Sequence, residues 1–217
     1  MRITAIEHQT RKRRYEVRID HVLLVTLSVE VFATANLRTG QEITPERVAD
    51  LEQLQARHFA MSSAMRLLAY RQRSEKEMGT ALQRRGVKPE LLAETMARLR
   101  EVRLLDDGEF ARSYVDQRDR TSPRGRRLLR AELRSKGVTP QAADEPLAEI
   151  DEADAAYRAA AKRARTLSTL PYPDFQRRLG DFLLRRGFGY DTSRETVKRL
   201  WCELREESPE EAEAFSQ

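Results

Sequence analysis

The apolar positions of this chain recur with two different periods. Apolar and charged residues alternate from Tyr15 to Ile19, and the apolar run Val22–Thr26 follows shortly after. A period of two predicts strands, so we expect a β-hairpin that turns at Asp20-His21. From residue 44 onward the apolar positions recur every three or four residues, which predicts helices over the remainder of the chain.

The clearest helical pattern occurs three times, at intervals of about 50 residues. Each copy has two apolar residues four positions apart, a glycine four positions further on, and a basic residue just before the glycine. The copies are Met78, Leu82 and Gly86; Leu129, Leu133 and Gly137; and Leu179, Leu183 and Gly187. The apolar pair lies on one helix face, and the glycine is expected to end the helix in a left-handed conformation. Such repetition indicates a helical repeat array, an architecture that commonly serves as a binding scaffold.

Capping residues indicate where the helices begin. We expect a short helix over 28–36 and a second helix that starts at Thr44-Pro45, with threonine as N-cap and proline in the first turn. This second helix runs toward Gln55, with a continuation to Tyr70 as the alternative. Further helix starts are expected at Ser74, Pro89, Asp106, Ser122-Pro123, Thr139-Pro140 and Pro171. Ser74 with Glu77, and Asp106 with Glu109, have the spacing of capping boxes.

The predicted fold class is mainly α. We expect an elongated array of three tandem three-helix repeats behind a small N-terminal extension of β-hairpin and helices. The apolar fraction of 40% and the charged fraction of 35% favour such an array over one compact core. The expected divisions are an N-terminal part at 1–60, repeats at 61–120, 121–170 and 171–205, and an acidic tail at 206–217.

The sequence offers little for catalysis. Asp106-Asp107 is better explained as a helix cap than as a paired carboxylate site, and the three histidines and Cys202 lack the spacing of zinc ligands. No phosphate-binding loop or nucleophile elbow is present. We therefore expect neither an enzyme nor a cofactor or metal. A single cysteine indicates a reducing compartment, and we expect no signal peptide and no membrane-spanning segment.

The charge distribution suggests where a partner could bind. The net charge is +5, but the last twelve residues hold five acids and no base, so the rest of the chain is at about +10. The segment 123–136 is the most basic, and the arginines on one helix flank within it have no counterparts in the other two copies. We expect this flank to bind an anionic or acidic partner, with a merely solvated surface as the alternative. The candidate contact residues are Arg124, Arg126, Arg127, Arg130, Arg134, Lys136, Arg185 and Arg186.

The region from Tyr70 to Val138 resembles the RecX regulatory proteins, which modulate the bacterial recombinase RecA. The resemblance lies in YRQRSEKEM at 70–78, LLDDGEFARSYV at 104–115 and SPRGRRLLRAEL at 122–133, and it extends over the third repeat. The N-terminal part, with Leu37-x-x-Gly40-Gln41-Glu42, looks like an extension that some members of the family carry.

This resemblance implies a non-catalytic, cytoplasmic and monomeric regulator. Its expected partner is the RecA filament, meaning RecA assembled on single-stranded DNA, with direct DNA contact as a further possibility and no role for a membrane. Family members lie in the filament groove, suppress ATP hydrolysis and strand exchange, and limit recombination and the SOS response. The alternative hypothesis is a protein that binds single-stranded DNA independently of RecA.

Overall fold

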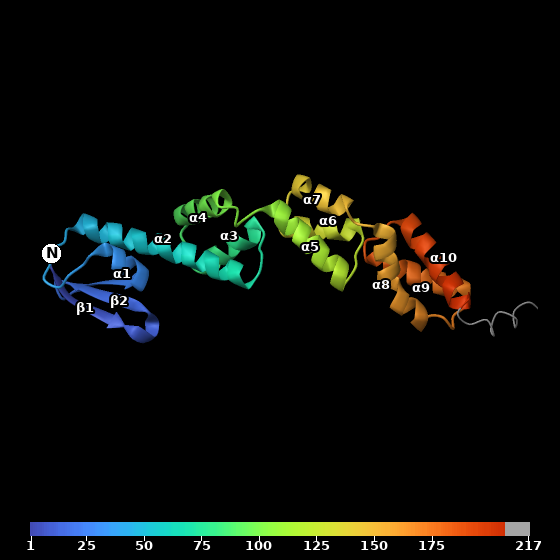
Figure 1. The fold of residues 1–217 in the computed structure, drawn as a ribbon, viewed down its shortest axis with the longest axis horizontal. Coiled ribbons are helices and arrows are strands. Elements are labelled where there is room, and N and C mark those ends of the chain that lie inside the picture. The colour runs from blue at the N-terminus through green and yellow to red at the C-terminus, as the bar shows by residue number, and fades with distance from the viewer. Residues whose placement is uncertain (207–217) are drawn as a thin grey trace, which may run out of the picture. The chain divides into compact units, whose positions relative to one another are not determined.

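The computed structural model describes residues 1–206, which contain ten α-helices and one three-stranded sheet (Figure 1). The mainly helical fold class is therefore confirmed. The chain forms two compact units. The first comprises Met1–Arg73 and Met78–Leu105, and the second comprises Ser74–Glu77 and the chain from Asp106 onward. The predicted acidic tail, apart from Glu206, lies outside the described residues.

The sheet is antiparallel, with strands β1 (Ile3–Gln9), β2 (Arg14–Ile19) and β3 (Leu23–Ser28) in that order. Strands β2 and β3 form the predicted hairpin, and β1 adds a strand that the sequence analysis did not predict. The hairpin turn has no glycine, yet both of its central residues, Asp20 and His21, have positive φ angles of 48° and 60°. Short polar and histidine side chains tolerate this conformation better than most, which explains how the hairpin closes.

Two helices complete the N-terminal part of the first unit. Helix α1 (Val29–Ala35) is capped by the Ser28 hydroxyl, and α2 (Pro45–Tyr70) by the Thr44 hydroxyl, as the capping signals predicted. Their apolar faces and the inner face of the sheet enclose one core. Because α2 runs without a break through residue 60, the predicted boundary at 60/61 falls inside a helix.

The C-terminal half of α2 belongs to the first three-helix group. Helices α3 (Glu75–Arg84) and α4 (Pro89–Glu101) follow it, and all three contribute to one buried cluster. That cluster includes Ala64 from α2, Met78 from α3 and Leu99 from α4, which are completely buried. The glycine-ended helix α3 is thus the middle member of its group and not the first.

The second unit contains the remaining six helices, in two groups. They are α5 (Asp107–Thr121), α6 (Arg126–Ser135), α7 (Pro140–Ala148), α8 (Glu152–Thr166), α9 (Tyr172–Arg185) and α10 (Tyr190–Glu206). Helices α5 and α6 pack on α7, whereas α8, α9 and α10 pack on one another. The divisions therefore fall after Leu105 and near Ile150, not at 120/121 and 170/171 as predicted. These groups differ in phase from the predicted repeats, because the glycine-ended helix is the middle helix of each group.

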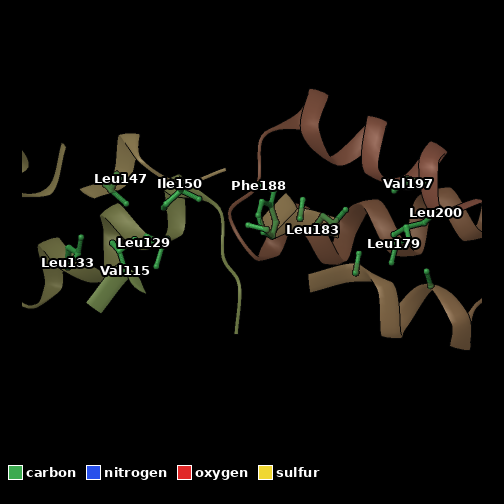
Figure 2. Close-up of a cluster of buried hydrophobic side chains, with 14 of the residues drawn as sticks. Val115, Leu129, Leu133, Leu147, Ile150, Leu179, Leu183, Phe188, Val197 and Leu200 are labelled. Atoms are coloured by element: carbon green, nitrogen blue, oxygen red, sulfur yellow. The ribbon is translucent and has the colours of Figure 1, made fainter. Parts of the chain in front are cut away.

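The apolar pairs of the repeat are the centre of these groups. Leu129 and Leu133 of α6, and Leu179 and Leu183 of α9, are at most 1% exposed. Figure 2 shows the first pair with side chains of α5 and α7, and the second pair with side chains of α10. Burial of these large apolar side chains is the main favourable contribution to the stability of each group.

The ends of the repeated helices confirm one expectation and correct another. Gly86, Gly137 and Gly187 have φ angles of +81°, +89° and +85°, the left-handed conformation that the capping pattern predicted. Ser122-Pro123 does not start a helix, because Ser122 ends α5 and α6 begins at Arg126 behind Gly125. A Cβ at Gly125 would lie 2.2 Å from the carbonyl oxygen of Gly187, so only glycine allows this close approach.

Candidate partner-binding site

Helix α6 carries the basic flank that the sequence analysis singled out. Its buried side presents Leu129 and Leu133 to the core, and Arg127, Arg130 and Arg134 are exposed. These arginines are three and four positions apart, so they follow one side of the helix. The predicted contact residues nevertheless divide into those that stabilise the fold and those that remain accessible.

Arg126 is a structural residue. Its backbone N–H donates to Glu152 Oε1 at 3.0 Å, and its guanidinium donates to the carbonyl oxygens of Ile150 at 2.7 Å and Ala148 at 3.4 Å. It therefore satisfies carbonyl groups at the end of α7, where the helix has no internal donors left. Contacts within the fold therefore account for Arg126.

Arg124 and Lys136 are also engaged within the second unit. Arg124 forms an ion pair with Glu132, whose carboxylate also accepts a hydrogen bond from the Tyr114 hydroxyl at 2.9 Å. Lys136 Nζ lies 2.8 Å from Glu77 Oε1 and 5.1 Å from the centre of the Tyr114 ring. All of these charged groups are less than a third exposed, so the two basic residues are poorly available to a partner.

Arg186, like Arg124 and Lys136, makes its contacts within the second unit. Its guanidinium donates to the carbonyl oxygen of Pro123 at 3.2 Å and lies 4.8 Å from the centre of the Phe182 ring. Burial, with a smaller contribution from the positive charge of Arg124, lowers the pKa of the Arg186 guanidinium. It remains charged at neutral pH, but its contacts are internal.

Four of the eight predicted residues remain exposed, and we call them the arginine face: Arg127, Arg130, Arg134 and Arg185. Arg127 donates to the carbonyl oxygen of Leu184 at 2.7 Å, which brings α6 next to the residue before Arg185. Arg130 pairs with Asp144 at 3.3 Å, but both side chains are more than half exposed, so this ion pair is weak. Within residues 1–206, Arg134 and Arg185 have no ion-pair partner.

A groove in the first unit was not predicted from the sequence. It has a volume of about 750 Å³ and lies between α1, α2 and α4, with Val31, Leu54 and Met61 among its lining residues. The charged residues at its rim pair locally, as Arg57 does with Glu94 at 3.2 Å and Arg98 with Glu101 at 2.6 Å. No local pattern could have indicated this groove, because its walls come from segments far apart in the chain.

Two further searches covered the described part of the chain. Residues 1–206 contain no group of three or more His, Cys, Asp or Glu side chains placed to hold a metal ion. Over the same range, none of the helices combines the length and apolar character needed to cross a bilayer.

The fold and the site together define a class, the helical-repeat proteins, here with three successive three-helix groups and an exposed basic face. Comparison with known families finds the same division. Residues 60–99, 106–147 and 149–197 match the first, second and third three-helix domains of RecX. The chain belongs to the RecX family of regulatory proteins.

Individual relatives agree with this assignment. The chain is 39% identical over 139 residues to the regulatory protein RecX of Chlorobaculum tepidum, which covers 64% of this chain and 86% of that protein. It is 32% identical over 201 residues to the regulatory protein RecX of Levilactobacillus brevis, covering 91% and 76%. A crystal structure of regulatory protein RecX superimposes with a TM-score of 0.69 at 25% identity, covering 91% of this chain and 98% of the other.

Proposed function

We propose that this protein is a non-catalytic regulator that binds the RecA nucleoprotein filament and inhibits its ATP hydrolysis and strand exchange. It would act as a monomer in the cytoplasm and limit recombination and the SOS response. The observation that carries the proposal is the match of three consecutive three-helix domains, in the family's order, to RecX. The name regulatory protein RecX, which its relatives bear, supports the same function.

The arginine face is the surface that we assign to this binding. Its members are exposed, and the side chains of Arg134 and Arg185 make no ion pair or hydrogen bond with any residue between 1 and 206. Guanidinium groups bind carboxylates and phosphates through two parallel hydrogen bonds. Both are expected on a filament built of protein and DNA, so the face can orient the regulator and accelerate its encounter with the filament.

The proposal is tested by binding to preformed RecA filaments. We expect the double variant Arg130→Glu/Arg134→Glu to bind filaments at least about tenfold more weakly than the wild type. The matched control is Lys162→Glu/Lys198→Glu, which makes the same change in net charge at exposed positions of α8 and α10. The control should bind like the wild type. Equal weakening by both variants would mean that net charge, and not this face, determines binding.

The alternative function is RecA-independent binding of single-stranded DNA, which the same arginines could support through phosphate contacts. The two functions are separated by comparing bare single-stranded DNA with RecA filaments at moderate salt. Tighter binding to filaments favours the regulator. Binding to bare DNA that is as tight as binding to filaments would favour the alternative.

A further inference from the structure

The loop that follows α6 docks onto the start of α3. The Ser74 hydroxyl donates to the carbonyl oxygen of Lys136 at 2.6 Å, and Lys76 Nζ donates to the carbonyl oxygen of Ser135 at 3.1 Å. In the opposite direction, the Lys136 side chain reaches Glu77 in the first turn of α3. The basic residue before the glycine thus binds the segment Ser74–Glu77, which belongs to the same compact unit.

The loop that follows α9 makes an equivalent contact with the start of α6. The Gly125 N–H donates to the carbonyl oxygen of Arg186 at 3.0 Å, and Arg127 donates to that of Leu184 at 2.7 Å. The Arg186 side chain reaches back to the carbonyl oxygen of Pro123, as Lys136 reaches Glu77. The same contact therefore occurs twice within the second unit, and we call it the loop-to-helix contact.

The glycine has a second role in this contact besides its left-handed backbone. A Cβ at Gly137 would lie 2.5 Å from Cβ of Lys76, and a Cβ at Gly187 would lie 2.4 Å from Cβ of Leu128. Any larger residue would push the docked helix away. In these two cases, the sequence pattern of a basic residue, a glycine and an apolar residue marks a loop that packs against the start of another helix.

The third copy of the pattern, Arg85-Gly86-Val87 after α3, has the same backbone conformation. The N–H groups of Gly86 and Val87 donate to the carbonyls of Gln83 and Leu82, as the corresponding groups do after α6 and α9. Its surroundings differ, because a Cβ at Gly86 would meet nothing within 4 Å. Residues 83–86 are all exposed, and Arg85 has no ion-pair partner in the described range.

We propose that this loop, residues 83–87, is a docking site for the first turn of a helix in a partner protein. The two internal contacts indicate the chemistry of that helix. Its N-cap would offer an N–H or hydroxyl donor to the carbonyl oxygen of Arg85, and an acidic residue in its first turn would pair with the Arg85 side chain, as Glu77 pairs with Lys136. The inference rests on the proposed function, so the partner is a protein of the RecA filament.

A second copy of this chain is a poorer occupant. The starts of α3 and α6 are already covered by the loops after α6 and α9. In α9 the position that corresponds to Ser74 and Gly125 is Phe175, which lies inside the helix because α9 begins one turn earlier. Phe175 is completely buried, and its ring centre is 5.0 Å from that of Trp201. Among the repeated helices α3, α6 and α9, none therefore presents a vacant start.

The test uses the variant Gly86→Asn. Asparagine tolerates a left-handed backbone, and its side chain enters open space in the free protein, but it would collide with a docked helix. We expect binding to preformed RecA filaments to weaken by about tenfold or more. The matched control is Gly79→Asn, which places the same side chain in open space on α3 and should bind like the wild type.

A second variant, Arg85→Glu, covers the case in which Gly86→Asn does not fold, because Arg85 is exposed and its replacement leaves the backbone unchanged. It should also weaken filament binding. Wild-type affinity in both folded variants would overturn the inference and leave the proposed function intact. Failure of the wild type itself to bind filaments would overturn both. Self-association of the wild type that Gly86→Asn abolishes, measured by sedimentation, would show that the occupant is a second copy and would contradict our assignment.

Discussion

At the residue scale, two arginines of the same helix, α6, have different roles. Arg126 points its guanidinium at the carbonyl oxygens that end α7, whereas Arg134, two turns further on, is exposed and makes no ion pair within residues 1–206. The helical period predicted that both lie near one flank, but it could not show that the segment at the end of α7 contacts only Arg126. A basic residue in a basic helix therefore has to be assigned from its contacts.

This difference predicts a difference in stability. Arg126→Ala removes charged hydrogen bonds to the carbonyls of Ile150 and Ala148 and should lower the free energy of unfolding by about 1–2 kcal/mol. Arg134→Ala should change it by less than about 0.5 kcal/mol. Urea denaturation followed by circular dichroism measures both. Equal effects of the two substitutions would contradict the structural role given to Arg126.

At the element scale, the glycine-ended helices show what a local pattern can and cannot predict. The apolar pair, the caps at Ser74 and Asp106 and the left-handed glycines follow from neighbouring residues, and the structure has them where the sequence predicted. Where each three-helix group begins depends on which helices pack together. The spacing of apolar residues along one helix does not show whether that helix packs with the helix before it, the helix after it or both. Strand β1 was missed for a related reason, because it depends on pairing with β2.

The glycine loops give a prediction about stability. Gly86→Ala should cost about 1 kcal/mol, because alanine is strained in the left-handed region but meets no neighbour there. Gly187→Ala should cost at least about 1 kcal/mol more, because its Cβ would also lie 2.4 Å from Cβ of Leu128. Fluorescence of Trp201, the single tryptophan, reports the unfolding of the third domain for Gly187→Ala, and circular dichroism reports both. Equal costs would argue against the loop-to-helix contact.

Helix α10 is attached to α8 by a contact that depends on pH. Glu203 accepts hydrogen bonds from Arg199 at 2.7 Å and from the Tyr157 hydroxyl at 2.8 Å, and these bonds lower the pKa of the Glu203 carboxyl. A carboxyl whose pKa is lowered in the folded protein stabilises it above about pH 4.5, and this stabilisation is lost as the pH falls through the lowered pKa.

We therefore expect Glu203→Gln to be less stable than the wild type at pH 7 and the difference to shrink as the pH falls below about 4.5. Thermal unfolding monitored through Trp201 measures this difference across the pH range. A difference that stays constant down to pH 3 would show that the charge of Glu203 does not contribute.

At the scale of the whole molecule, the sequence predicted the fold class, the three repeats and the family. It also predicted the arginine-rich helix, and four of the eight candidate contact residues are exposed in the structure. The remaining four are engaged by contacts within the second unit, such as those of Arg124 with Glu132 and of Lys136 with Glu77. Contacts between segments far apart in the chain have no signature in local spacing, and this also applies to the groove beside α2.

The exposed arginines make filament binding sensitive to salt. Each charge contact with phosphates or carboxylates that is lost should reduce the slope of the logarithm of the binding constant against the logarithm of the salt concentration. We expect a shallower slope for Arg130→Glu/Arg134→Glu than for the wild type, with the Lys162→Glu/Lys198→Glu control unchanged. Identical slopes for all three proteins would mean that the arginine face makes no contact in the complex.

The central claim, regulation of RecA by binding, is tested most directly by ATP hydrolysis. Cognate RecA is assembled on single-stranded DNA, the protein is added in increasing amounts, and the steady-state rate of ATP hydrolysis is measured. The account predicts that the rate falls as the protein is added and that Arg130→Glu/Arg134→Glu is needed at higher concentration for the same inhibition. An unchanged rate at wild-type concentrations that saturate the filament would contradict the account.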